Sequence, residues 1–158
     1  MFTRILVAYD GGNISMKALD KAIELAKDTK AEIYIISIYT DNDIQAWRLR
    51  GSHYPANAGD LFNPNGKDFA AAETGYVNSF QVEPVAKVCQ AGIPVHCKIT
   101  KGKPDTAIVE YSKEICADLA VTGTHNRGNA AKLLLGSVAD SIIRNAPCPV
   151  MVVREEQE

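Results

Sequence analysis

The hydrophobic positions of this chain change their period along its length. Continuous apolar runs typical of buried strands alternate with the three- and four-residue spacing typical of helices. The first run covers Arg4 to Tyr9 and suits a parallel strand with both faces covered. Behind it, apolar side chains recur on one helical face opposite charged ones, and that stripe consists of Ala18, Leu19, Ala22, Ile23, Leu25 and Ala26. The chain therefore opens with a strand and an amphipathic helix.

The same alternation continues toward the C-terminus. The patterns predict further strands at Ile33 to Tyr39, Pro94 to Thr100, Asp118 to Thr122 and Pro149 to Val153. They predict helices at Asp105 to Cys116 and from Val138. In the third strand, His96 and Lys98 alternate with apolar residues, which predicts an exposed, edge-like strand. Five strands separated by helices indicate a Rossmann-like α/β fold, an open parallel five-stranded sheet with helices on both faces.

Residues 41–66 interrupt this order. They are rich in Asn, Asp, Gly and Pro and also carry Trp47, Tyr54 and Phe62. A loop of this length in a small domain is usually functional or disordered. Its aromatic side chains favour packing over a ligand or at a subunit contact, and a flexible excursion is the alternative. The segment from Lys67 to Gln90 then has helical spacing, with a break expected near Phe80, before Pro84.

Length and charge narrow the class of protein. A chain of 158 residues buries roughly two thirds of its unfolded surface, enough for one domain over residues 1–158. The 17 basic and 19 acidic residues give a formal net charge of -2, so no global positive field favours nucleic acid or anionic membranes. The N-terminus enters a strand at once, without a signal-peptide pattern, and the apolar runs are of strand length. These features predict a cytoplasmic protein.

Cysteines and histidines give no pattern of a metal site or a catalytic triad. The four cysteines are widely spaced without C-x-x-C, and we expect small buried hydrophobes rather than disulfides at Cys89, Cys97, Cys116 and Cys148. The three histidines lack metal-ligand spacing. A dedicated enzyme is therefore not expected. His125 is the one conceivable base for hydrolysis, and at most slow hydrolytic activity is predicted.

A glycine-rich loop carries the strongest chemical signal. Gly123 to Gly128 leaves a predicted strand and leads into a predicted helix, an arrangement that offers backbone N–H groups to a phosphate. Asn129 and Ala130 stand where a Walker loop needs Lys and Ser or Thr, which excludes that motif. The paired Gly11 and Gly12 lack the spacing of a dinucleotide fingerprint. A different kind of nucleotide site remains.

The spacing Gly123-x2-Asn126-x9-Gly136-Ser137 resembles the ATP-binding signature of the universal stress protein family, Gly-x2-Gly-x9-Gly-Ser/Thr, with Asn126 at the second glycine. The flanking segments also resemble that family over nearly the whole chain, and they are Ile5 to Gly11, Gly102 to Pro104 and Ala146 to Val153. Residues 41 to about 80 match poorly.

The resemblance implies strand order 3-2-1-4-5, which would place Asp10 beside Gly123 where strand order reverses. The predicted elements alone also suit a flavodoxin-like order 2-1-3-4-5. The implied ligand is ATP, with or without Mg²⁺. Its candidate binding residues are Ala8, Asp10, Ile38, Gly123, His125, Asn126, Arg127, Gly136, Ser137 and Val138.

Each implied role has a structural alternative. Asp10 would accept hydrogen bonds from ribose hydroxyls, or would bond its own turn. The main chain of Ile38 would meet adenine. Glycines 123 and 136 would admit phosphates to the backbone, and Ser137 would donate to a phosphate or cap the last helix. His125 and Arg127 would neutralise phosphate charge, or would simply be solvated.

Asn126 is the departure from the family pattern. Asn tolerates positive φ better than other non-glycine residues, so the loop can keep its shape while the amide crowds or bonds a phosphate. The favoured interpretation is an ATP-binding stress-response protein with a regulatory or protective role. The alternatives are a family member that binds no ATP and acts through protein contacts, and, less favoured, an ATP-using transferase or hydrolase.

The last predicted strand carries a further expectation. Its short, nearly terminal, apolar sequence should lie at a sheet edge, where unpaired backbone groups invite another strand. The resemblance implies a homodimer with two such edges antiparallel, through Pro149, Val150, Met151, Val152 and Val153. A monomer protected by the charged tail that begins at Arg154 is the alternative.

Overall fold

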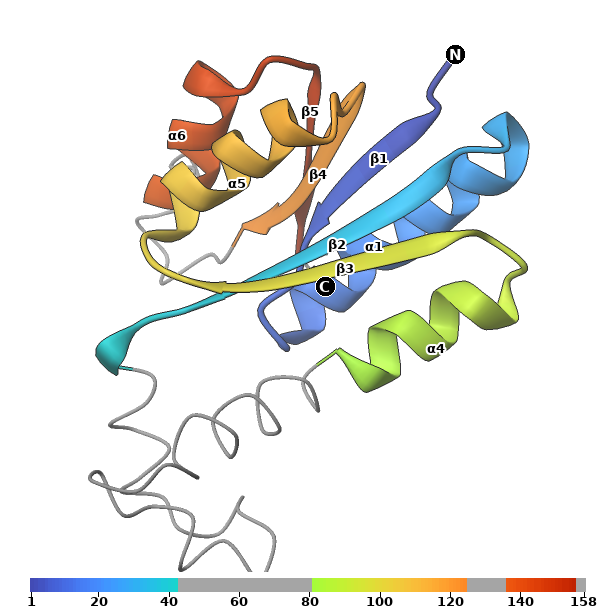
Figure 1. Cartoon of the computed structure of the whole chain (residues 1–158), viewed down its shortest axis with the longest axis horizontal. Helices are drawn as coiled ribbons and strands as arrows, with labels where there is room; N and C mark the ends of the chain where they lie inside the picture. The colour runs from blue at the N-terminus through green and yellow to red at the C-terminus, as the bar shows by residue number, and fades with distance from the viewer. Residues whose placement is uncertain (43–80, 125–135, 156–158) are drawn as a thin grey trace, which may run out of the picture.

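The computed structural model describes residues 1–42, 81–124 and 136–155. Strands and helices alternate along these residues as the sequence predicts (Figure 1). The elements are β1 (Arg4–Ala8), α1 (Asn13–Thr29), β2 (Glu32–Tyr39), α4 (Val82–Gln90), β3 (Val95–Lys101), α5 (Pro104–Glu114), β4 (Leu119–Thr124), α6 (Ser137–Asn145) and β5 (Val150–Arg154).

The five strands form one parallel sheet of order β3-β2-β1-β4-β5. The predicted α/β class and the order 3-2-1-4-5 are confirmed, and the order 2-1-3-4-5 is excluded. β1 is central, and its Ile5 lies opposite Ile33 of β2 and Leu119 of β4. β3 is an edge strand, as its mixed polar and apolar sequence predicts.

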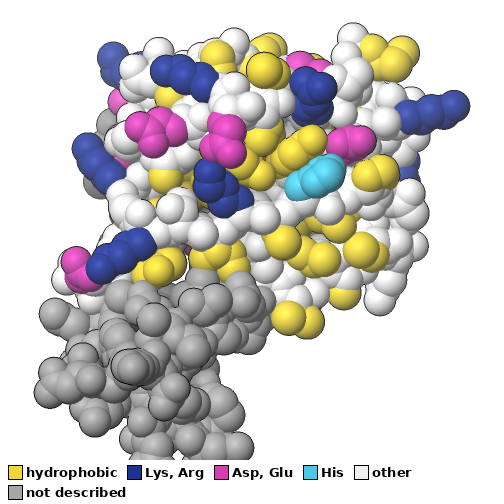
Figure 2. Space-filling model, in the orientation of Figure 1, with side chains coloured by type: hydrophobic (Ala, Val, Ile, Leu, Met, Phe, Trp, Pro, Cys, Tyr) yellow, Lys and Arg dark blue, Asp and Glu magenta, His cyan; other side chains and the backbone are white. Residues whose placement is uncertain are grey.

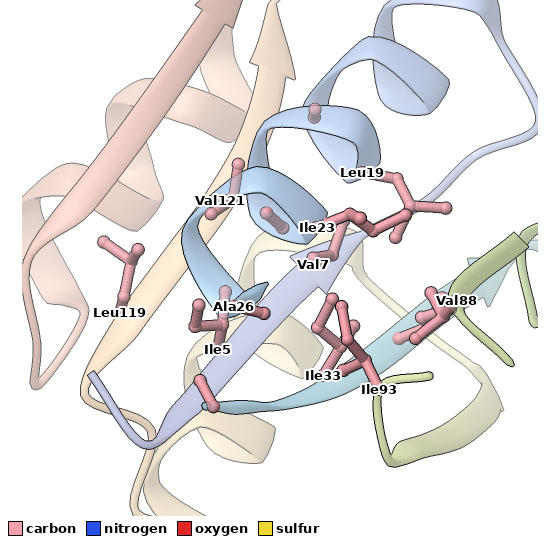
Figure 3. Packing of buried hydrophobic residues seen from close by; sticks show 14 of the residues in the cluster. Ile5, Val7, Leu19, Ile23, Ala26, Ile33, Val88, Ile93, Leu119 and Val121 are labelled. Atoms are coloured by element: carbon pink, nitrogen blue, oxygen red, sulfur yellow. The ribbon is translucent and has the colours of Figure 1, made fainter. Parts of the chain in front are cut away.

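Two hydrophobic clusters cover the two faces of the sheet. Ile5 and Val7 of β1 pack beneath α1 and α4, against side chains such as Leu19 and Val88 (Figure 3). Between them in the sequence, Leu6 points to the opposite face and packs beneath α5 and α6. These strand residues are fully buried. The continuous apolar run of β1 thus arises because both its faces are covered.

Glycine and proline set several element ends. Gly11, with φ of 85°, turns the chain between β1 and α1. Pro104 opens α5 in the first turn, where its missing N–H leaves no helical bond unmade. Pro84 occupies the first turn of α4 in the same way, so the break predicted before it corresponds to the start of α4 at Val82. Residues 67–80 lie outside the described part.

The prediction of buried cysteines is wrong. Cys89, Cys97 and Cys116 are exposed, and Cys148 is partly buried. Cys89 lies on the outer side of α4, and Cys97 lies on the edge strand β3. All four cysteines are free thiols, in keeping with the expected absence of a disulfide framework.

The predicted loop over residues 41–66 lies almost wholly outside the described residues, and its first two residues, 41 and 42, are helical.

No helix in the described ranges has the length and apolar character needed to cross a membrane. On the face that bears α5 and α6, acidic and basic side chains are interspersed among apolar ones (Figure 2).

A carboxylate ties the amino ends of β1 and β4 together. Asp118 Oδ2 accepts hydrogen bonds from the backbone N–H and the hydroxyl of Thr3, both at 2.7 Å, and Oδ1 accepts one from the Arg4 N–H at 3.1 Å. Partial burial alone would raise the pKa of Asp118, but these hydrogen bonds outweigh it and lower the pKa below its ordinary value of 3.8.

Asp118→Asn is expected to lower the free energy of unfolding at pH 7 by about 1 kcal/mol, a value discounted for the solvent exposure of the carboxylate. A depressed pKa stabilises the fold above the unfolded-state pKa, and this contribution is lost as pH falls through the folded-state pKa. The difference between wild type and variant should therefore shrink below about pH 3.8. Urea denaturation at several pH values measures it. Exposed Asp28→Asn is the control, and an equal loss there would contradict the assignment.

Candidate functional site

A pocket opens at the carboxyl ends of β1, β2 and β4. In open parallel sheets, ligands bind where strand order reverses, and here that point lies between β1 and β4. The pocket volume is about 190 Å³, below the roughly 300–1,000 Å³ of whole ligand pockets. The lining residues therefore accommodate part of a larger ligand, and they are Ala8, Tyr9, Asp10, Ser15, Ile36, Ile38, Pro104, Ile108, Thr122, Gly123 and Val138.

The structure brings half of the sequence-predicted residues together in this pocket. Residues from both ends of the chain meet there, namely Ala8, Asp10, Ile38, Gly123 and Val138. Gly136 and Ser137 do not line the pocket but immediately precede Val138, at the start of α6. His125, Asn126 and Arg127 lie outside the described residues.

Asp10 lies two residues beyond the end of β1, in an exposed turn that it also stabilises. Its Oδ1 accepts a hydrogen bond from the Gly12 N–H at 2.8 Å. This is the structural role in the turn that the sequence offered as the alternative to ribose binding. Its own N–H donates to Ser15 Oγ at 3.3 Å, and that hydroxyl donates to the Gly12 carbonyl at 2.8 Å. The turn therefore fixes the carboxyl group at the pocket wall.

Gly123 is required for packing against α1. A Cβ added at Gly123 would lie 2.6 Å from Ile14 Cγ2 and 3.2 Å from the Ile14 carbonyl carbon. Sequence reasoning assigned this glycine to phosphate approach alone. The first turn of α1 lies so close to β4 at this point that a Cβ at residue 123 would clash with Ile14.

Gly136 is held at the entrance to α6. Its N–H donates to Thr124 Oγ1 at 3.2 Å, which joins the end of β4 to the start of α6. Gly136 is the N-cap of α6, and this helix has no side-chain cap. The alternative interpretation of Ser137 as a capping residue is therefore wrong. Ser137 is an exposed residue of the first helical turn.

Three helices begin beside the pocket. Ser15, Pro104 and Val138 lie in the first turns of α1, α5 and α6. Helix N-termini carry partial positive charge and unpaired N–H groups, which favour an anion. The first turn of α1 contains no acidic residue. Other lining residues are apolar, namely Ala8, Ile36, Ile38 and Ile108. This combination suits a ligand with a flat apolar part and an anionic part.

One polar contact and one raised pKa characterise the surroundings of the pocket. Ser141 Oγ donates to Asp105 Oδ2 at 2.8 Å and joins α6 to the first turn of α5. This bond leads the causes that lower the pKa of Asp105. Burial, together with the Glu83 and Asp10 carboxylates, raises the pKa of the Tyr9 phenol, which therefore stays protonated at neutral pH.

Sequence reasoning missed the lining residues Tyr9, Ser15, Ile36, Pro104, Ile108 and Thr122, and the anchoring residue Thr124. Only their positions in the predicted elements could have identified these residues, because each lies toward the carboxyl end of a strand or in the first turns of a helix. Thr122 and Thr124 are polar residues in an apolar strand and are only 5% and 3% exposed. The described residues contain no cluster of three or more His, Cys, Asp or Glu side chains that could hold a metal ion.

Comparison of the fold with solved structures gives matches over the whole chain. The structure of hypothetical protein MJ0577 has a TM-score of 0.75 at 19% identity, and covers 100% of this chain and 99% of that one. A universal stress protein in complex with cAMP has a TM-score of 0.66 at 22% identity, with 98% of each chain covered. An Arabidopsis thaliana family member with AMP bound has a TM-score of 0.60 at 17% identity, covering 98% and 92%. These likenesses show the fold.

Sequence comparison shows the family. The family model described as "Universal stress protein family" matches residues 1–154. A universal stress protein of Methanocaldococcus jannaschii is 29% identical over 159 residues, which cover 100% of this chain and 85% of the relative. The match spans strands, pocket and C-terminal strand together. This chain therefore belongs to the universal stress protein family.

Proposed function

We propose that this protein is an ATP-binding stress-response protein with a regulatory or protective role, formed by one domain over residues 1–158 and acting in the cytoplasm. The observation that carries the proposal is the meeting of Asp10 and Gly123 in one pocket, where strand order reverses. Relatives in fold that hold cAMP and AMP support a nucleotide as the ligand class.

In this proposal the parts of ATP follow the chemistry of the pocket walls. The base lies against the apolar wall that includes Ala8 and Ile38, and the vicinal ribose hydroxyls bond the Asp10 carboxylate. The phosphates, with Mg²⁺, lie toward the N-terminus of α6. The residues proposed to contact them are Gly123, His125, Asn126, Arg127, Gly136, Ser137 and Val138. No catalytic residue is proposed.

Titration calorimetry with ATP and Mg²⁺ tests the proposal, with one ATP expected per chain. Asp10→Ala should weaken binding by about tenfold, because it removes a charged acceptor of hydrogen bonds from the ribose. The distant, exposed Asp28→Ala, near the C-terminus of α1, is the control and should leave affinity unchanged. Thermal unfolding of each variant without ligand separates lost binding from lost fold.

The second candidate is a family member that acts through protein contacts without ATP. Asn126 favours it, because it replaces a glycine of the family's ATP signature. Absence of detectable ATP binding by the wild-type protein at millimolar nucleotide would reject the first proposal and favour this one.

We also propose a homodimer through β5. This strand is at the sheet edge and pairs only with β4 among the described strands. Its residues 150–153 are partly buried. Met151, Val153 and Val150 pack against the two core clusters, whereas Val152 joins neither cluster. Val152 is therefore the side chain of β5 best placed to meet a second copy of the chain.

A further inference from the structure

The peptide unit between Tyr9 and Asp10 is held at both of its polar atoms. Its N–H, which belongs to Asp10, donates to Ser15 Oγ at 3.3 Å. Its carbonyl oxygen, which belongs to Tyr9, accepts a hydrogen bond from Ser37 Oγ at 2.7 Å. Because a peptide unit is planar, fixing both atoms fixes the direction in which the chain enters Asp10.

Ser37 belongs to β2 but lies outside the pocket. Its neighbours Ile36 and Ile38 line the pocket. Because side chains alternate along a strand, Ser37 points to the opposite face of the sheet. There Ser37 is only 6% exposed. Its hydroxyl is a donor to Tyr9 and an acceptor from the side chain of Gln81, whose Nε2 lies 2.9 Å away.

Gln81 is the N-cap residue of α4 and is 3% exposed. Its Nε2 also donates to the Lys98 carbonyl of β3 at 3.2 Å. The amide thus joins three elements, α4, β2 and β3, behind the pocket wall. Among the described residues, no group forms a hydrogen bond with Gln81 Oε1.

This oxygen, which has no partner among the described residues, bears on the role of Gln81. A buried acceptor without a partner is destabilising, whereas an apolar group of similar shape is often nearly neutral in its place. The cost of the Oε1 atom therefore offsets part of the stability that the two hydrogen bonds from Nε2 contribute. The hydrogen bonds from Nε2 also orient the Ser37 hydroxyl toward the peptide of Asp10.

We propose that Gln81 is a positioning residue of the ligand pocket, which acts through Ser37 and the Tyr9–Asp10 peptide to hold the Asp10 carboxylate toward vicinal hydroxyls of the ligand. The inference rests on the proposed nucleotide function. Gln81, at the start of α4, would thus affect the affinity for the ligand without contacting it.

The test compares Gln81→Met and Ser37→Ala with Gln90→Met, a matched change at the exposed end of the same helix. Two ligands are titrated, ATP and 2′,3′-dideoxy-ATP, which lacks both hydroxyls. Gln81→Met and Ser37→Ala should weaken ATP binding by about three- to tenfold and dideoxy-ATP binding by less than about twofold. Gln90→Met should change neither. Unchanged ATP affinity in Gln81→Met would overturn the proposal, and so would equal weakening of both ligands, which indicates general damage to the pocket.

A second measurement needs no ligand. Hydrogen exchange at the Asp10 and Gly12 amides should be faster by about tenfold in Gln81→Met than in wild type, because the turn is held less firmly. Exchange at the wild-type rate would overturn the inference even if ATP binds. Faster exchange in a protein that binds no ATP would support the relay while rejecting the proposed ligand.

Discussion

Gly123→Ala is expected to lower the free energy of unfolding by about 2–3 kcal/mol. The added methyl group would lie 2.6 Å from Ile14 Cγ2 and 3.3 Å from the Ile14 carbonyl oxygen. Rotation of the Ile14 side chain can relieve the first contact. The second involves backbone, so it requires α1 to move away from β4, and α1 also packs on the central strand β1.

Urea denaturation followed by circular dichroism measures this loss. Gly136→Ala is the matched control, since among the described residues a Cβ there would meet Thr124 Oγ1 alone, at an ordinary contact distance of 3.6 Å. It should change stability by less than about 0.5 kcal/mol. Equal stabilities of the two variants would show that Gly123 is not a packing requirement.

Val152→Lys is expected to raise the dissociation constant of the proposed dimer by at least about a hundredfold. In a twofold symmetric interface each substitution occurs twice, so two ammonium groups would be desolvated at the same strand pairing. Folding should be little affected, because Val152 packs against neither described core cluster.

Sedimentation over a range of concentrations measures the association. Wild type should be a dimer at micromolar concentration and Val152→Lys a monomer. The control is Val82→Lys, the same change at a side chain that is 66% exposed at the start of α4. A wild-type monomer at all accessible concentrations would remove the proposed interface, and a dimeric Val152→Lys variant would place the contact elsewhere.

The sequence predicted the strands well because most are buried on both faces and therefore read as continuous apolar runs. Hydrophobic pattern left two strand orders open, since both use the same elements, and only the family resemblance favoured the observed one. Gly123 could be recognised as part of a motif. Its steric role could not, because Ile14 is remote in the sequence and meets it only after α1 has packed on the sheet.

Buried polar contacts were the least predictable part. Ser37 lies within an apolar strand, and Gln81 precedes a helix that was expected to begin well upstream. Neither residue type indicates which backbone group it will meet, whereas the start of α4 near Gln81 agrees with the break predicted near Phe80. The burial of the cysteines was wrongly predicted for a similar reason, since residue type alone does not show whether a small apolar side chain on an edge strand or at the end of a helix will be covered.

The hydrogen bond between Gly136 and Thr124 has a consequence for how this family can diversify. It joins the two ends of the intervening segment, residues 125–135, to one fixed point of the sheet. When the ends of a segment are anchored, each doubling of its length costs only about 0.6 kcal/mol of closure entropy. Segments of other sequences and lengths can therefore be grafted between the same two residues, which would exchange the segment proposed to contact the phosphates while the sheet keeps its register.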